Sequence, residues 1–321
     1  MTLIGQDKAI AAFRAAMDSG SLHHAWLLAG PRGVGKGSFA RAAALRVLAS
    51  AAGPQVSLPG LDVPPDHRIA RLFEAGSHPD FRRLERQPND KGDLRRNITV
   101  DQVRSLGSLF SVAPALSPWR AVIIDSIDEL EPSAANALLK MLEEPPGQSL
   151  FFLVSHAPGR LLPTIRSRCR RLDFPALDAA SLDAVLQRAR PEQKSDERAR
   201  LVSVAGGSAS RALAVADLDL APLAEEALAI LRRGDADNSR RSRLASALAL
   251  KAAAPRYAAF LNMVPPLLAR EAREAEGTRR ERAVAAYAKA RDTAGLAPRL
   301  SLDPGATVFA LGTILAEVAE G

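Results

Sequence analysis

The chain has 321 residues, of which 47% are hydrophobic and 25% charged, and its formal net charge at pH 7 is +7. This length suits two or three domains, and the hydrophobic fraction excludes a wholly disordered chain. No apolar run reaches the roughly 18 residues that cross a bilayer, no secretory leader is recognisable, and the lone Cys169 excludes an internal disulfide and a multi-cysteine zinc site. We therefore expect a soluble cytoplasmic protein with no membrane partner. Its mild positive charge is compatible with nucleic acid nearby but does not identify a binding surface.

Strands and helices alternate in the first half of the chain. Short apolar runs predict strands at 25–29, 81–86, 121–125, 150–154 and 170–174. Apolar residues at helical spacing predict helices at 36–49, from Val100 past Phe110 with Thr99 as N-cap, and from a Ser133 cap to Pro145. Residues 51–67, with four prolines, are expected to be an irregular surface excursion. Alternating strands and helices predict an α/β domain whose parallel sheet is covered on both faces.

The second half of the chain shows no sequence pattern typical of strands. Three short helices are expected at 178–190, 194–205 and 208–216. Longer ones are expected at 219–233, 240–253 (with Ser239 as a candidate cap), 256–275, 278–294 and 305–320. The predicted domains are an α/β domain at 1–175, a small helical domain at 176–217 and an all-helical C-terminal domain at 218–321.

Residues 30–37, with the sequence GPRGVGKG, match the phosphate-binding pattern G-x-x-x-x-G-K between a predicted strand and a predicted helix. Glycines let consecutive backbone N–H groups point at phosphate oxygens, and the helix N-terminus and a lysine add positive charge. The candidate nucleotide-site residues are Gly30, Gly33, Gly35, Lys36, Gly37, Ser38 and Asp125.

Two positions of this P-loop site lack the groups that hydrolysis needs. Gly37 stands where a Ser or Thr hydroxyl would hold Mg²⁺, and Ser38 is rotated by about 100° along the helix. Asp125 ends a strand where an acid supports Mg²⁺, but Ser126 follows where a carboxylate would orient water. Asp128 and Glu129 are interpreted as solvated acids. The pattern favours a P-loop with a structural role only. We expect no ATP hydrolysis by this chain alone and no bound metal.

Four further segments carry a family resemblance: LIGQ at 3–6, HHAWLL at 23–28, AANALLKMLEEPP at 134–146 and IRSRC at 165–169. Together they resemble the bacterial AAA+ clamp-loader subunits, and most of all the delta-prime family of the DNA polymerase III clamp loader. The resemblance is close over residues 1–175 and extends to the remainder through domain order only.

This resemblance implies an AAA+ P-loop domain, a small helical lid domain and a helical collar that joins a hetero-oligomeric ring. It implies that Arg168 acts as an arginine finger on ATP bound to the adjacent subunit, and it places Arg211 as a candidate nucleotide-sensing arginine. The implied partners are the gamma/tau and delta subunits, and the sliding clamp and primed DNA through the assembled complex.

Many members of this family carry a four-cysteine zinc module after the P-loop helix, but this chain lacks those cysteines, so no zinc and no required cofactor are expected. Weak ATP or ADP binding stays open.

Other readings stay open beside this one. An active ATPase motor subunit of the gamma/tau type is the main alternative, and a free-standing P-loop kinase is a third. Ser155 is either a phosphate sensor or a strand terminus, and the five histidines show no metal-ligand spacing. The basic stretch Arg82, Arg83, Arg86, Lys91, Arg95 and Arg96 is interpreted as a solvated edge.

Overall fold

The computed structural model describes residues 3–89, 92 and 94–319. The chain divides into two compact units, Met1–Ala176 and Leu177–Gly321, here called the N-terminal and C-terminal units. The further predicted boundary between 217 and 218 stays a prediction. None of the described helices combines the length and apolar character that a bilayer crossing requires.

The N-terminal unit is built on a five-stranded sheet in which all neighbouring strands are parallel. The strands are β1 (Ala25–Ala29), β2 (Phe81–Leu84), β3 (Arg120–Asp125), β4 (Ser149–Ser155) and β5 (Arg170–Asp173). Their order across the sheet is β2-β3-β4-β1-β5. Ala29 is in register with Ser155 and Asp173, and Asp125 with Val154, so the carboxyl ends of these strands meet at one edge. Ligands of open parallel sheets bind at this edge.

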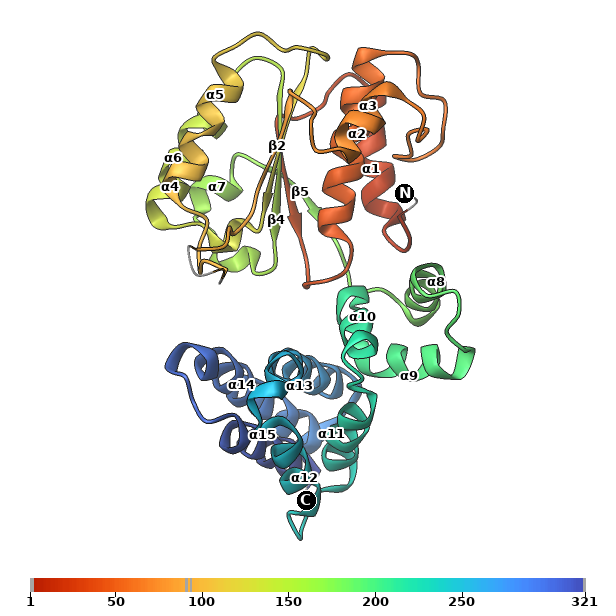
Figure 1. Ribbon diagram of the computed structural model, residues 1–321, viewed down its shortest axis with the longest axis vertical. Coiled ribbons are helices and arrows are strands. Elements are labelled where there is room, and N and C mark those ends of the chain that lie inside the picture. The colour runs from red at the N-terminus through yellow and green to blue at the C-terminus, as the bar shows by residue number, and fades with distance from the viewer. Residues whose placement is uncertain (1–2, 90–91, 93, 320–321) are drawn as a thin grey trace. The chain divides into compact units, whose positions relative to one another are not determined.

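Helices cover both faces of this sheet (Figure 1). One face packs against α1 (Asp7–Asp18), α2 (Lys36–Ala52) and α3 (Arg68–Glu74). The other packs against α4 (Val100–Arg104), α5 (Leu106–Phe110), α6 (Pro132–Glu143) and α7 (Pro163–Arg166). Along β4, Phe151 and Leu153 belong to one core and Phe152 and Val154 to the other, because side chains of a strand alternate between its faces. The predicted α/β fold with a parallel sheet is confirmed.

Two helix predictions in this unit need correction. The helix expected from Val100 is two helices, because Ser105 ends α4 and begins α5. Thr99 does cap α4, in a capping box with Gln102. Ser133 is not a cap: Pro132 takes the first position of α6, where its fixed φ suits a helix and its missing N–H is not needed.

The segment between α2 and α3 has no helix or strand but is more than a surface excursion. Val56, Leu61 and Val63 are buried in the core. The buried guanidinium of Arg46, on α2, donates to the carbonyl oxygens of Leu58, Val56 and Asp62 at 2.9, 2.9 and 2.7 Å. One buried side chain therefore accounts for hydrogen bonds to three backbone carbonyls of this segment.

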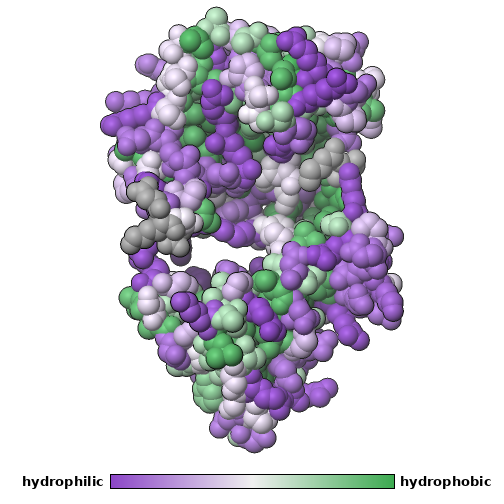
Figure 2. All heavy atoms as spheres, viewed as in Figure 1, coloured by the Kyte–Doolittle hydropathy of each residue, from purple (hydrophilic) through white to green (hydrophobic). Residues whose placement is uncertain are grey.

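The described residues of the C-terminal unit form helices joined by loops, with no strand among them, and share one continuous hydrophobic core. Its first helices are α8 (Ala179–Ala189), α9 (Ser195–Ala205) and α10 (Ala209–Asp217). They are followed by α11 (Ala221–Arg233), α12 (Ser239–Leu248), α13 (Ala254–Glu274), α14 (Gly277–Leu300) and α15 (Pro304–Ala319). On the visible face, the surface around α8 and α9 is mostly hydrophilic (Figure 2), in keeping with the charged sequence of α9.

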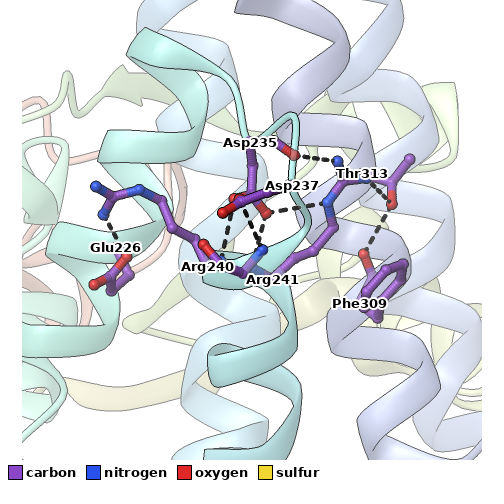
Figure 3. A network of polar contacts seen from close by, with 8 residues as sticks. Glu226, Asp235, Asp237, Arg240, Arg241, Phe309 and Thr313 are labelled. Atoms are coloured by element: carbon purple, nitrogen blue, oxygen red, sulfur yellow. Dashed lines mark hydrogen bonds and ion pairs between the residues drawn. The ribbon is translucent and has the colours of Figure 1, made fainter.

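A buried ion pair lies at the start of α12, and a hydrogen bond from its arginine joins this helix to α15 (Figure 3). Arg241 Nε contacts Asp235 Oδ2 at 3.2 Å, and its Nη1 donates to Thr313 Oγ1 at 3.0 Å. Asp235 also accepts the backbone N–H groups of Arg240 and Arg241, and so caps the helix N-terminus. Asn238 occupies the N-cap position, so the expected Ser239 cap is wrong.

Candidate functional site

The P-loop lies where the sequence predicts it, between β1 and α2. Gly30 is required by close packing, because a Cβ there would come within 2.0 Å of the Phe174 carbonyl oxygen. Gly35 is the N-cap of α2 and has φ +98°, a conformation that favours glycine. Gln6 Nε2 donates to the Val34 carbonyl at 3.0 Å and so ties the N-terminal LIGQ segment to this loop.

The lysine of the loop is buried against its own backbone. Lys36 is 3% exposed, and its Nζ donates to the Gly30 carbonyl at 2.6 Å and to the Pro31 carbonyl. Burial, together with the charge of nearby Arg32, lowers the pKa of Lys36 to about 8, although Asp128 and Asp125 oppose the shift. The ammonium would have to leave these carbonyls to reach a phosphate.

The position after the lysine lies directly beside Asp125. A Cβ on Gly37 would be 3.1 Å from Asp125 Oδ2, so this is the place where a hydroxyl and a carboxylate would share a magnesium ion. Instead, the same Oδ2 accepts from Arg83 Nη2 at 3.0 Å. Ser38 is one residue further along α2 and half-buried.

Asp128 is not a solvated acid, contrary to the expectation from sequence. Its carboxylate accepts from Ser126 Oγ at 3.0 Å and from Ser155 Oγ at 2.8 Å. It also accepts the backbone N–H groups of His156 and Ala157. Asp128 therefore links the ends of β3 and β4, and Ser155 is a fully buried strand end whose hydroxyl is held by this carboxylate.

Glu129 is likewise paired rather than solvated. Its carboxylate contacts Arg32 Nη2 in the P-loop and Arg86 Nε after β2, each at 2.9 Å. With Arg83 on Asp125, two arginines of the predicted basic stretch thus lie at the nucleotide site. Lys91 of that stretch lies outside the described residues. Sequence reasoning missed these contacts because the stretch is more than 30 residues from the acids it meets.

His156 is a further neighbour of the loop that the sequence did not single out. Burial lowers its pKa to about 4, helped by the charges of Lys36 and Arg32. It is therefore neutral at pH 7. No group of His, Cys, Asp and Glu suited to a metal ion occurs among residues 3–89, 92 and 94–319.

Arg168 lies on the same unit, just after α7, with 34% of its side chain exposed. Its Nη2 forms an ion pair with Glu143 Oε1 at 2.8 Å, and its Nη1 donates to the Thr164 carbonyl at 2.9 Å. Next to it, burial raises the pKa of the Cys169 thiol to about 12, so this cysteine stays protonated and serves as packing.

Arg211 belongs to α10 in the C-terminal unit. Its Nη1 donates to the Ala205 carbonyl at 2.6 Å, and burial lowers its pKa. The guanidinium thus has a partner within its own helical unit, and its sensing role stays a prediction.

Comparisons with known proteins give the family. A family model described as "DNA polymerase III, delta subunit" matches residues 5–178. The chain is 37% identical over 188 residues to the DNA polymerase III subunit delta' of Pseudomonas aeruginosa, covering 58% of this chain and 53% of that protein. It is 33% identical over 227 residues to the gamma/tau subunit of Mycobacterium bovis, covering 70% of this chain and 37% of that one.

These alignments thus span about half, or less, of the curated relatives' own lengths. Among solved structures, a DNA polymerase III gamma subunit-related protein from Thermotoga maritima aligns with a TM-score of 0.45 and 15% identity, over 97% of this chain and 100% of that one. Because the family model matches more than half of the residues, the chain belongs to the DNA polymerase III delta subunit family of clamp-loader proteins.

Proposed function

We propose that this chain is a delta'-type clamp-loader subunit that helps to load the sliding clamp onto primed DNA without hydrolysing ATP itself. One observation carries this proposal: at the P-loop, Gly37 supplies no hydroxyl and Asp125 is bound by Arg83. The chain then contributes to catalysis through Arg168, which acts on ATP held by a neighbouring subunit.

The residues at the P-loop do not fit a catalytic magnesium ion. A guanidinium at 3.0 Å already neutralises Asp125, and Mg²⁺ demands several oxygen ligands in near-ideal octahedral geometry. Ser126 offers a hydroxyl in place of a water-orienting carboxylate, and that hydroxyl donates to Asp128. No hydrolytic step is assigned to this site. Nucleotide is not required for the role of the chain, and any ATP or ADP in the loop would be held without turnover.

Arg168 has the chemistry of a trans-acting finger. A guanidinium spreads its charge over five N–H donors and stabilises charge that develops on a transferred γ-phosphoryl group. Its half-exposed position lets it meet a neighbour, and Ile165 and Cys169 anchor the turn on either side in the core. In this proposal the gamma/tau and delta subunits are its partners in a cytoplasmic hetero-oligomer, joined through the helical C-terminal unit.

The test is to reconstitute the loader with its own gamma-type and delta subunits and measure ATPase stimulated by clamp and primed DNA. Arg168→Ala should lower hydrolysis at the site that faces this chain by roughly 10³-fold or more. Arg166→Ala, which removes an exposed arginine two residues earlier, is the matched control and should leave the rate unchanged. Unchanged stimulated ATPase with Arg168→Ala would reject the finger.

An active motor subunit is the second candidate, because the gamma/tau relative aligns over more of this chain than the delta' relative does. In that case the purified chain alone would hydrolyse ATP in the presence of Mg²⁺, and Lys36→Ala would abolish the activity. We expect no such activity above that of the Lys36→Ala variant.

A further inference from the structure

We infer that Glu143 is a positioning residue for Arg168: its carboxylate holds the guanidinium in the place from which it reaches a neighbouring subunit's ATP. This inference rests on the proposed trans-acting role of Arg168. It starts from the 2.8 Å contact between Arg168 Nη2 and Glu143 Oε1, which joins the end of α6 to the residues after α7.

The backbone on both sides of this pair is fixed. Ile165 and Cys169 are packed in the same core as Leu142, the residue before Glu143. Pro145 and Pro146 follow the last turn of α6 and prevent the helix from continuing. The two side chains therefore project from rigid supports, and only their own torsions are left to be set.

The guanidinium is held from two directions and keeps donors to spare. Nη2 is directed to Glu143, and Nη1 donates to the Thr164 carbonyl at 2.9 Å. An arginine has five N–H donors, so these contacts leave some for an external phosphate oxygen. Holding a long side chain in one rotamer family before the partner arrives removes part of the entropy cost of the catalytic contact.

Local helix chemistry does not explain the acid at this position. A helix C-terminus carries partial negative charge and favours cations, yet α6 ends with Glu143 and has Glu144 as its C-cap. A residue that breaks a local rule is expected where function needs it. Lys140 already provides a cation in the last turn of α6, and Arg168 adds a second one from outside the helix. Glu143 in turn gives the Arg168 guanidinium a fixed anchor.

The experiment compares four variants in the reconstituted loader: Glu143→Gln, Glu144→Gln, Arg168→Ala and Arg168→Lys. Glu144→Gln is the matched control because it removes the same charge one residue away. Glu144 lies beside Lys140 and Arg104 rather than at Arg168. Glu143→Gln should lower the Arg168-dependent part of kcat by roughly two- to fivefold, the worth of an exposed ion pair, with KM for ATP unchanged. Glu144→Gln should match the wild type.

The dependence of the ATPase rates on salt concentration distinguishes positioning by an ion pair from a merely structural role. The pair is half-exposed, so its effect is screened as ionic strength rises from about 0.05 to about 0.5 M. The ratio of wild-type to Glu143→Gln rates should approach one over this range, while the ratio for Glu144→Gln stays near one throughout. Circular dichroism melting checks that each variant is folded, and Arg168→Lys replaces Arg168→Ala if the alanine variant is not.

The outcomes separate the two proposals. If the Arg168 variants lose stimulation and Glu143→Gln equals the wild type, or raises the rate, the positioning role is overturned and the finger stands. If the Arg168 variants keep full stimulation, the proposed function fails, and with it this inference. A two- to fivefold loss that disappears with salt supports both.

Discussion

Both units of this chain use arginine–carboxylate pairs, but in different surroundings. In the C-terminal unit the side chains of Arg241 and Asp235 are 10% and 1% exposed, and their remaining polar groups find partners (Figure 3). At the P-loop, Arg83 and Asp125 are 43% and 22% exposed. Water screens the second pair, so it contributes little to folding, whereas breaking the first leaves a buried charge alone. The two pairs have similar N–O distances, so it is burial that separates the pair that stabilises the fold from the pair at the P-loop.

The largest expected effect is on the buried pair. Arg241→Ala should lower the free energy of unfolding by about 3–5 kcal/mol, because Asp235 loses its cation while staying buried. Urea unfolding followed by circular dichroism measures this. Arg243→Ala, which removes an exposed partner of Glu226, should change stability by less than about 0.5 kcal/mol. Similar losses for the two variants would contradict the distinction.

The next largest effect separates architecture from chemistry in the P-loop. Gly30→Ala should cost about 1–3 kcal/mol, because its Cβ would lie 2.0 Å from the backbone oxygen of Phe174. Gly159→Ala is the control, since a Cβ there meets no atom within 4 Å. Thermal melting of the purified variants tests this, and equal melting temperatures would show that the loop adjusts freely.

Acid should weaken the C-terminal unit through Asp235. Burial alone would raise the pKa of this carboxyl, but hydrogen bonds from the backbone of Arg241 and Arg240 and the guanidinium of Arg241 outweigh it, so the pKa is lowered. A lowered pKa in the folded state means that the contribution to stability is complete above the ordinary value of about 3.9 and is lost as pH falls below it. The urea midpoint measured between pH 7 and pH 2 tests this. In Asp235→Asn the midpoint should fall less steeply at acid pH than in the wild type. An equally steep fall in that variant would assign the effect to other carboxylates.

The smallest expected effect is on the exposed pair. Arg83→Ala should cost less than about 1 kcal/mol of stability, because the ion pair is half-exposed. It should also fail to create ATP hydrolysis, since Gly37 and Ser126 still lack the required groups. Stability and ATPase of the isolated variant check both points, with Arg82→Ala as the neighbouring control. The appearance of Mg²⁺-dependent hydrolysis would mean that Arg83 alone blocks the site.

Much of the fold was predictable because its signals are local. Apolar runs placed all five strands within two residues, and the glycine-lysine pattern placed the loop between β1 and α2. The prediction omitted α1 and α3, although Ala9, Phe13 and Ala16 follow a helical period in α1. The break at Ser105 was also missed, because the apolar spacing runs on through both helices.

The pairing of charges at the site was not predictable in the same way. Arg83 meets Asp125 only because β2 lies next to β3, and strand order cannot be read from apolar runs. Asp128 is anchored by Ser155 for the same reason, since β4 is the other neighbour of β3. Residue types at the site could be predicted from sequence, but the choice of partner required the three-dimensional arrangement.

Arg46 holds the segment after the P-loop helix in place through hydrogen bonds from its own side chain. Its guanidinium stays protonated at any physiological pH, is covalently part of α2, and binds three carbonyl oxygens of the following loop. Unlike a bound metal ion, these hydrogen bonds are not removed by a chelator, and unlike a disulfide, they are not broken by a reductant. These three contacts of the loop therefore need neither a metal ion nor a disulfide to form.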